Sequence, residues 1–367
     1  MPLKTSKLRA LLRGLLKDIR NRMLYWSGAY AWASRRLARQ GAIIAINVHR
    51  ILPNDLYSRT NSPGGMLLKE QTFWKMCNFI QKELRFAHPR ELDARNTNQH
   101  PAILLTLDDG WKDNVTPLSE LSRMGIASLV FICPQKVGQT NPYWPEVGNA
   151  LWRAARSQGA TRGSGSVDRE RPRRPATSRH SSEAFIAKLK RMDRSQRERM
   201  LASLNKQFTP VLFASDSTMT WDDVHALQKL GVEFGSHGLT HELLPSLPDR
   251  ELQAEVETSR TLIAEILGDC PRLAYPNGDC DERVREQVSR AGYKHAFINS
   301  PGPVTKDTDR LAIPRINLNE RKVCGSGGRF SKYAFLHATV WTCYRVQRAA
   351  GVIVPKLEIG SSVGGGW

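Results

Sequence analysis

The sequence predicts an α/β fold in which a parallel sheet closes into a barrel. Apolar, β-rich runs alternate with amphipathic helical patterns along most of the 367 residues, which is the order typical of parallel strands joined by crossover helices. Several strands are continuous apolar runs, as expected when both faces of a sheet are covered. Acidic and histidine side chains follow these strands, and functional residues gather at the carboxyl ends of barrel strands.

Seven strands are expected, and that number favours a closed barrel. Their ranges are 42–48, 103–107, 128–132, 232–235, 272–275, 295–298 and 311–316. Helices are expected at 72–84, 115–123, 183–205, 222–230, 250–267 and 282–291. The barrel therefore spans residues 41–319. A basic amphipathic segment at 1–40 precedes it, and a helix near 333–349 and a flexible tail follow at 320–367.

One segment, 157–182, interrupts the alternation of strand and helix. It has no aromatic residue and almost no aliphatic residue, so it cannot bury enough surface to offset the entropy of ordering. We expect a disordered basic insert. Binding to the phosphate of a glycan carrier or of nucleic acid is the alternative use of its arginines.

The excess positive charge lies mainly outside the predicted barrel. Of a net charge of +19, residues 1–39 contribute ten Lys and Arg against one Asp, and residues 153–182 contribute eight Arg against two acidic residues. Strongly basic proteins normally bind nucleic acid or an anionic membrane. Because the rest of the chain is nearly neutral, nucleic acid is not the favoured partner, and an uncharged substrate suits the barrel.

Residues 1–39 predict a helix that lies in an anionic membrane surface. At about 100° per residue, one arc is apolar and cations flank it. The apolar residues are Leu8, Leu11, Leu12, Leu15, Leu16, Ile19, Met23 and Trp26. Tyr25, Trp26, Tyr30 and Trp32 are available as interfacial anchors. The alternative is a helix that packs its apolar stripe on the barrel.

No run of the sequence has the length or apolar character of a membrane span or a signal peptide. The expected location is therefore cytoplasmic, peripheral on the inner face of the cytoplasmic membrane.

The buried strand at 103–107 ends on two adjacent carboxylates, Asp108 and Asp109, followed by Gly110. Carboxylates at the end of a buried strand are costly without a partner. Glycine permits the chain to turn there, so that the two acids can serve different purposes. A helix N-cap is the alternative use of this sequence.

A second polar cluster follows the strand at 232–235. His237 and His241 are four residues apart, and on a helical turn both imidazoles would lie on one face and reach one ion. Together with a strand-end aspartate they predict a two-histidine, one-aspartate site with open positions, as in hydrolytic metal centres.

Three motifs in this order carry a family resemblance: TLDDG at 106–110, GSHGLTH at 235–241 and LAYPNG at 273–278. The chain resembles the polysaccharide deacetylases, or carbohydrate esterase family 4, which include chitin-oligosaccharide and peptidoglycan deacetylases. The resemblance covers roughly residues 42–318. It implies an irregular (β/α)7 barrel, in agreement with the alternation of strands and helices.

The resemblance also implies a role for each site residue. Asp109, His237 and His241 would bind the metal, and Asp108 would be the general base. The backbone N–H of Asn277 would stabilise the anionic tetrahedral intermediate.

Two positions depart from the family pattern. Family members often carry an arginine that orients the catalytic aspartate where this chain has Ala274. Arg315 could replace it from a neighbouring strand end, and a surface ion pair is the alternative role of Arg315.

The late Leu-x-His motif, which supplies the general acid in the family, is not recognisable. His49 matches the permuted motif order of the poly-N-acetylglucosamine deacetylase subgroup and is expected across the metal from Asp108. His337 is the alternative acid.

These residues predict a metal-dependent hydrolase that removes N-acetyl groups from amino sugars of a bacterial cell-surface glycan or its lipid-linked precursor. Zinc is the expected metal, although the same ligands accept cobalt, nickel or manganese. An O-deacetylase is one alternative, and a non-catalytic glycan-binding or nucleic-acid-binding protein is another. The presence of both aspartates favours the enzyme, because binding alone has no use for a general base.

Overall fold

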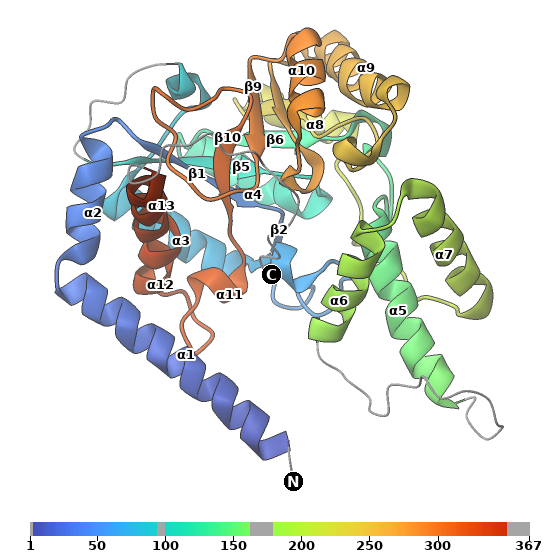
Figure 1. Ribbon diagram of the computed structural model, residues 1–367, viewed down its shortest axis with the longest axis horizontal. Coiled ribbons are helices and arrows are strands. Elements are labelled where there is room, and N and C mark those ends of the chain that lie inside the picture. Colours follow the sequence, from blue (N-terminus) through green and yellow to red (C-terminus); the bar gives the residue numbers. More distant parts are fainter. Residues whose placement is uncertain (1–2, 94–99, 162–178, 351–367) are drawn as a thin grey trace.

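The computed structural model describes residues 3–93, 100–161 and 179–350, and a parallel barrel lies at its centre (Figure 1). Its strands are β1 (Ile43–Val48), β5 (Ala102–Leu107), β6 (Leu129–Ile132), β7 (Glu233–Ser236), β8 (Arg272–Ala274), β9 (His295–Ile298) and β10 (Ile313–Asn317). Because β1 pairs with both β5 and β10, the seven strands close into a ring. The predicted seven-stranded α/β barrel is confirmed.

Three groups of helices surround the barrel. The first covers the outside of the strands: α3 (Glu70–Glu83), α4 (Val115–Arg123), α8 (Trp221–Lys229), α9 (Asp249–Leu267) and α10 (Glu282–Arg290). The second lies together on one side: α5 (Trp144–Thr161), α6 (Arg179–Lys190) and α7 (Arg194–Gln207) (Figure 1). The third comes from the two ends of the chain: α1 (Leu3–Trp26), α2 (Ala29–Ala38), α11 (Glu320–Val323), α12 (Lys332–Leu336), a π-helical turn (His337–Trp341) and α13 (Thr342–Ala350).

Three short strands add to this framework. β2 (Arg50–Leu52) and β3 (Leu67–Lys69) pair with each other, and β4 (Arg85–Phe86) pairs with the first residues of β5.

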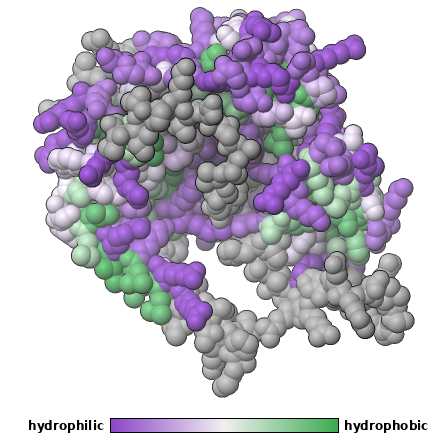
Figure 2. All heavy atoms as spheres, viewed as in Figure 1, coloured by the Kyte–Doolittle hydropathy of each residue, from purple (hydrophilic) through white to green (hydrophobic). Residues whose placement is uncertain are grey.

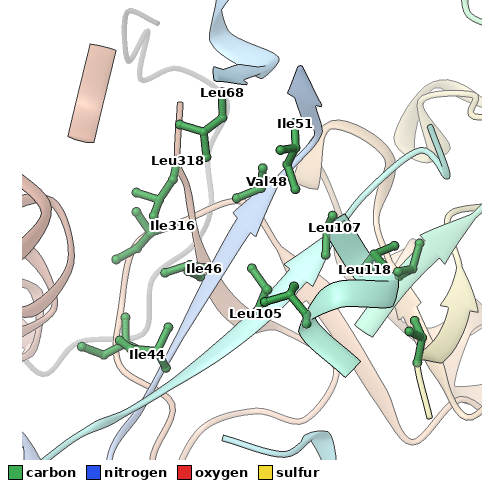
Figure 3. Close-up of a cluster of buried hydrophobic side chains, with 14 of the residues drawn as sticks. Ile44, Ile46, Val48, Ile51, Leu68, Leu105, Leu107, Leu118, Ile316 and Leu318 are labelled. Carbon is green, nitrogen blue, oxygen red and sulfur yellow. The ribbon is translucent and has the colours of Figure 1, made fainter. Parts of the chain in front are cut away.

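The barrel strands carry two layers of buried side chains, because successive residues of a strand point to opposite faces. The outer layer packs under the helices and includes Ile44, Ile46, Val48, Leu105, Leu107 and Ile316 (Figure 3). The inner layer fills the barrel and includes Ile43, Ala45, Leu104, Phe131, Phe297 and Ile313. The strands are thus buried on both faces, as their continuous apolar sequences predict, and they hold the polar residues at their ends in fixed positions.

The helices between β6 and β7 differ from the prediction. Helix α5 was not expected, and the expected helix at 183–205 is two helices, α6 and α7, separated at 191–193. Most of the expected insert, 162–178, lies outside the described residues. The prediction of disorder is wrong at both ends of this insert, because residues 157–161 continue α5 and residues 179–182 begin α6.

The N-terminal helices differ in how they contact the rest of the molecule. Helix α2 is anchored in the core through Tyr30, Ala33 and Leu37, which are all buried. Helix α1 extends away from the barrel along α11 and α12 (Figure 1). In the part of the chain that the structure describes, no helix combines the length and apolar character that crossing a membrane requires.

Candidate metal centre

Three predicted ligands meet at the carboxyl ends of two strands. Asp109 follows β5, and His237 and His241 follow β7. The Nε2 atoms of His241 and His237 lie 3.3 and 3.5 Å from Asp109 Oδ1, and the three donor atoms all lie within 4.8 Å of one another. Tetrahedral coordination with bonds of about 2.1 Å separates two donor atoms by about 3.4 Å. The three side chains are therefore spaced to hold one divalent ion.

The hydrogen bonding of Asp109 fits this use. Its Oδ2 accepts a hydrogen bond from Trp111 Nε1 at 3.1 Å. Its Oδ1 is buried and accepts no hydrogen bond from any described residue. A buried carboxylate oxygen without a partner is costly, and a cation between it and the two imidazoles would satisfy it. Two imidazoles and a carboxylate are a donor set that zinc and similar ions accept.

The two imidazoles differ in their electrostatic surroundings. His237 Nδ1 lies 2.7 Å from the carbonyl oxygen of Ala274 and can donate its proton there, which leaves the Nε2 lone pair for a metal. Burial lowers the pKa of His237 to about 4, so the ring is neutral at pH 7. Burial also lowers the pKa of His241, but the Asp109 carboxylate more than offsets this effect, and the net shift is upward.

Sharp turns bring the ligands to this edge of the barrel. Asp109, His241 and Asn277 have φ angles of 72°, 69° and 61°, in the left-handed region that costs an L-residue about 1–2 kcal/mol. The expected helical turn between His237 and His241 is wrong, because the chain after β7 forms bends. The left-handed residue at 241 returns this imidazole toward Asp109, and the two histidine rings lie 4.9 Å apart.

Asp108 occupies a different environment from its neighbour. Arg315 donates to both of its oxygens, at 2.7 and 3.0 Å, and Asn47 Nδ2 donates to Oδ2 at 2.7 Å. Burial raises the pKa of Asp108, but Arg315 and then His237 lower it more, so the net shift is downward and the carboxylate stays ionised. Arg315 is only 1% exposed, so the alternative of a surface ion pair is wrong.

The alternation of side chains explains this contact. Strand register pairs Ala45 with Arg315 and Asn47 with Thr106. Asn47, Thr106 and Arg315 therefore point to the same side, the barrel interior, and Asp108 follows Thr106 by two residues. Arg315 Nη1 also donates to Thr106 Oγ1 at 3.1 Å.

The two candidate general acids lie in different parts of the molecule. His49 Nε2 is 3.9 Å from Asp108 Oδ2, so His49 lies beside Asp108, and its expected position across the metal stays a prediction. Burial lowers the pKa of His49, although the two aspartates oppose this shift. His337 instead bonds Tyr30 and Arg20, each at 3.1 Å, near the N-terminal helices. It does not line the cavity at the metal centre, so it cannot serve as the alternative acid.

The third motif forms a tight turn beside the ligands. Asn277 and Gly278 both have positive φ angles in a 3-10 turn that follows β8. A Cβ on Gly278 would lie 2.3 Å from the backbone nitrogen of Asn299, so only glycine fits. The side chain of Asn277 accepts a hydrogen bond from Lys190 of α6. This turn places the Asn277 backbone at the wall of the cavity.

A cavity of about 120 Å³ contains all seven predicted site residues in its walls. Helices outside the barrel complete it: Tyr143, Trp144 and Glu146 come from the start of α5, and Ile186 and Lys190 come from α6. Sequence reasoning missed these five residues. No motif marks them, and their part of the chain was not predicted as a wall of the site.

The fold and the site together define a barrel hydrolase whose ligand set is suited to a divalent metal ion. A family model described as "Polysaccharide deacetylase" matches residues 95–296, which is more than half of the chain. The chain belongs to the polysaccharide deacetylase family, as its three motifs predicted.

Solved structures resemble this chain at low sequence identity. IcaB from Ammonifex degensii has a TM-score of 0.50 and 15% identity, over 77% of this chain and 94% of that one. The Streptococcus pyogenes deacetylase PplD in complex with acetate has a TM-score of 0.49 and 12% identity, over 78% of this chain and 96% of that one. A comparison with curated protein sequences finds no match.

Proposed function

We propose that this polysaccharide deacetylase removes N-acetyl groups from amino sugars of a bacterial cell-surface glycan or of its lipid-linked precursor. Asp109, His237 and His241 would hold the metal. Zinc is the expected ion, and cobalt, nickel and manganese are the alternatives. A divalent ion bound there supplies Lewis-acid polarisation of an acetamide carbonyl and lowers the pKa of water.

The remaining site residues would move protons and stabilise charge. Asp108, ionised and held by Arg315, takes a proton from the attacking water. The backbone N–H of Asn277 donates a hydrogen bond to the oxygen that becomes negative. His49, in its protonated imidazolium form, would donate a proton to the leaving amine and become neutral. Its position on the first barrel strand is our reason for placing the chain in the subgroup with permuted motif order.

The observation that carries this proposal is the separation of the two carboxylates. Asp109 Oδ1 lies 3.3 and 3.5 Å from two imidazoles, whereas Asp108 is fixed by an arginine fork and lies 3.9 Å from both His49 and His237. A binding module has no need for a second, separately held carboxylate.

Acetate release from N-acetylhexosamine glycans, with and without chelator, tests the proposal. We expect release that chelator abolishes and zinc restores. Release only from O-acetylated sugars would identify the O-deacetylase instead. No release from either class by the zinc-loaded protein would leave a non-catalytic binding protein.

We also infer that α1 binds an anionic membrane surface, on the cytoplasmic face. Its outward side is apolar, as Figure 2 shows along this helix, and Leu16, Met23 and Trp26 are 64%, 66% and 77% exposed. On its inward side, Gly14 and Asp18 lie beside Ser326, and Leu24 and Tyr25 near its end pack against the core. This arrangement contradicts the alternative in which the stripe packs on the barrel.

The flanking residues support a lipid surface as the partner. Arg9, Arg13 and Arg22 are exposed on α1, and Trp32 on α2 is 51% exposed. Cations beside an apolar stripe favour anionic headgroups over a neutral partner. The prediction that Tyr30 is an interfacial anchor is wrong, because Tyr30 is buried against His337.

Flotation with vesicles tests this inference. We expect binding to vesicles that contain phosphatidylserine or phosphatidylglycerol, with affinity falling as salt rises, because each cation contributes about 1 kcal/mol that ions screen. Binding that ignores both lipid charge and salt would contradict it.

A further inference from the structure

Several residues in the wall of the metal-centre cavity have a buried polar atom without a hydrogen-bond partner among the residues of 3–93, 100–161 and 179–350, and two of these atoms belong to the start of α5. They are Trp144 Nε1, a donor, and Glu146 Oε2, an acceptor. Both atoms are buried, and both residues line the cavity. Buried polar atoms in proteins almost always have partners, so two orphans in one cavity wall indicate that a ligand supplies them. Neither residue has a part in the proposed chemistry.

The Glu146 carboxylate is held in place from behind. Glu146 has no exposed surface, and its Oε1 accepts a hydrogen bond from Ser62 Oγ at 2.9 Å. Ser62 Oγ in turn accepts from Arg50 Nη1 at 3.0 Å, and Arg50 is itself fully buried. One oxygen is thus used for positioning, and the other is left for a ligand.

The Trp144 ring is held in a similar way. The Arg197 guanidinium carbon lies 4.7 Å from the ring centroid, a cation–π distance. Arg197 Nη2 also bonds Glu242 Oε2 at 2.5 Å, and Glu242 directly follows the ligand His241. The indole is therefore tied to the loop that carries a metal ligand.

We propose that the start of α5 forms a sugar-binding subsite in which Trp144 and Glu146 hold the amino-sugar ring beside the metal centre. This inference rests on the proposed function. A carboxylate accepts hydrogen bonds from sugar hydroxyls, an indole N–H donates to a hydroxyl or acetamide oxygen, and the indole ring contacts the apolar face of a pyranose.

The environment of Glu146 suits a hydroxyl-bearing ligand in a further respect. Burial raises the pKa of Glu146 to about 7, and the Asp109 carboxylate adds to the shift. The Glu146 carboxyl group can then either accept a hydrogen bond from a hydroxyl or donate one to it. A sugar hydroxyl can take the complementary role in both cases.

Binding of sugars to the zinc-loaded full chain tests the subsite without depending on turnover. Ligand-observed NMR with the methyl glycosides of N-acetylglucosamine, N-acetylgalactosamine and N-acetylmannosamine measures affinity for wild type, Glu146→Gln and Trp144→Phe. Glu146→Gln keeps the shape of the side chain and removes its charge, and Trp144→Phe keeps an aromatic ring but removes the indole N–H and part of the ring surface. We expect at least one glycoside to bind wild type, and each variant to bind it about tenfold or more weakly with zinc content unchanged.

Two matched controls separate the subsite from general effects of these substitutions. Trp152→Phe changes a tryptophan of the same helix that also has an arginine over its ring, 5.0 Å from the centroid, but does not line the cavity. Glu198→Gln changes a glutamate on the outer surface of α7. Both should bind the glycoside as wild type does.

The subsite is refuted if no glycoside binds wild type, if the two variants bind as wild type does, or if their weaker binding follows a matching loss of zinc. Failure of the proposed function gives a different result. If wild type binds a glycoside through Trp144 and Glu146 but the zinc-loaded protein releases no acetate from any N-acetylated or O-acetylated glycan, the subsite stands and the deacetylase assignment falls.

Discussion

Asp108 and Asp109 are adjacent in sequence and both lie near His237, yet their closest partners differ. The left-handed conformation of Asp109 turns the chain between them. Asp109 then faces His237 and His241, and Asp108 faces Arg315 inside the barrel. One backbone dihedral angle therefore separates the proposed metal ligand from the proposed base, and exchanging the two roles would require the turn to move.

The first prediction tests this division of roles. Asp108→Asn should lower the rate of acetate release by about 10²–10⁴-fold and leave zinc content near that of wild type, because no ligand atom changes. His237→Ala should lose both activity and zinc, because it removes a ligand. Turnover assays and metal analysis of the purified variants measure the two effects. Equal zinc loss in both variants would mean that Asp108 is a ligand.

The second prediction concerns Arg315, which we interpret as a positioning residue. Arg315→Lys keeps the charge but cannot form the two-pronged contact, so kcat should fall about 10- to 100-fold with little change in KM. Arg315→Ala leaves Asp108 buried without its cation, and the free energy of unfolding should fall by about 3–5 kcal/mol.

An arginine on the surface provides the control for Arg315. Arg285 of α10 pairs with Asp309 at 2.7 Å, but both side chains are partly exposed. Arg285→Ala should change the free energy of unfolding by about 1 kcal/mol or less. Similar losses in the two alanine variants, measured by urea denaturation, would contradict a special role for the buried pair.

Among the secondary-structure elements, α1 has the reverse of the usual orientation, with its apolar side outward. Helical periodicity predicted the apolar arc correctly, but periodicity does not say which side faces the molecule. That side is chosen by contacts far along the chain, such as Lys17 with the carbonyl oxygen of Arg321 and Asp18 with the backbone of Ser326.

The third prediction follows from this orientation. The double variant Leu16→Ser, Met23→Ser should weaken vesicle binding about tenfold or more, because two apolar side chains no longer enter the lipid. Its melting temperature should stay within about 2 °C of wild type, since both residues are mostly exposed. Leu37→Ser in α2 is the contrasting variant: Leu37 is fully buried, so the melting temperature should fall. Unchanged vesicle binding by the double variant would exclude α1 as the membrane contact.

For the whole molecule, the metal site links binding to stability. Asp109 and His237 follow different strands, so an ion that binds them binds the folded chain far better than the unfolded one. At a free zinc concentration of 100 times Kd, the gain is about 2.7 kcal/mol.

The fourth prediction is therefore a thermal one. Chelator should lower the melting temperature by about 5 °C or more, and added zinc should restore it. The His237→Ala variant should show no such response, because it lacks a ligand. Scanning fluorimetry measures both proteins, and a chelator response that persists in the variant would place the stabilising ion elsewhere.

Local sequence predicted the barrel well and its surroundings poorly. Each strand buries both faces, so its apolar run is visible in a few residues. Helix α5 has no such signal. The burial of Glu146 depends on Ser62, more than 80 positions away, and no local pattern records that contact.

The predicted site residues were found for similar reasons. Strand ends meet at one edge of a barrel, so Asp108, Asp109 and His237 could be brought together from strand order, whereas Arg315 was proposed only through the family resemblance. The path of the chain from His237 to His241 could not be predicted in this way. It depends on the left-handed conformation of His241, which is rare for a residue other than glycine.

The closure of β1 against β10 has a consequence for synthesis of the protein. The first barrel strand can pair with β5 early, but its second edge and the partner of Asp108 both wait for residues 313–317, close to the end of the barrel sequence. Such long-range pairing is slow to form. On the ribosome, the emerging chain would therefore hold an open sheet and an unpaired buried acid until its last strand appears. Chaperones would meet this protein late in translation, and catalytic competence would arrive together with ring closure.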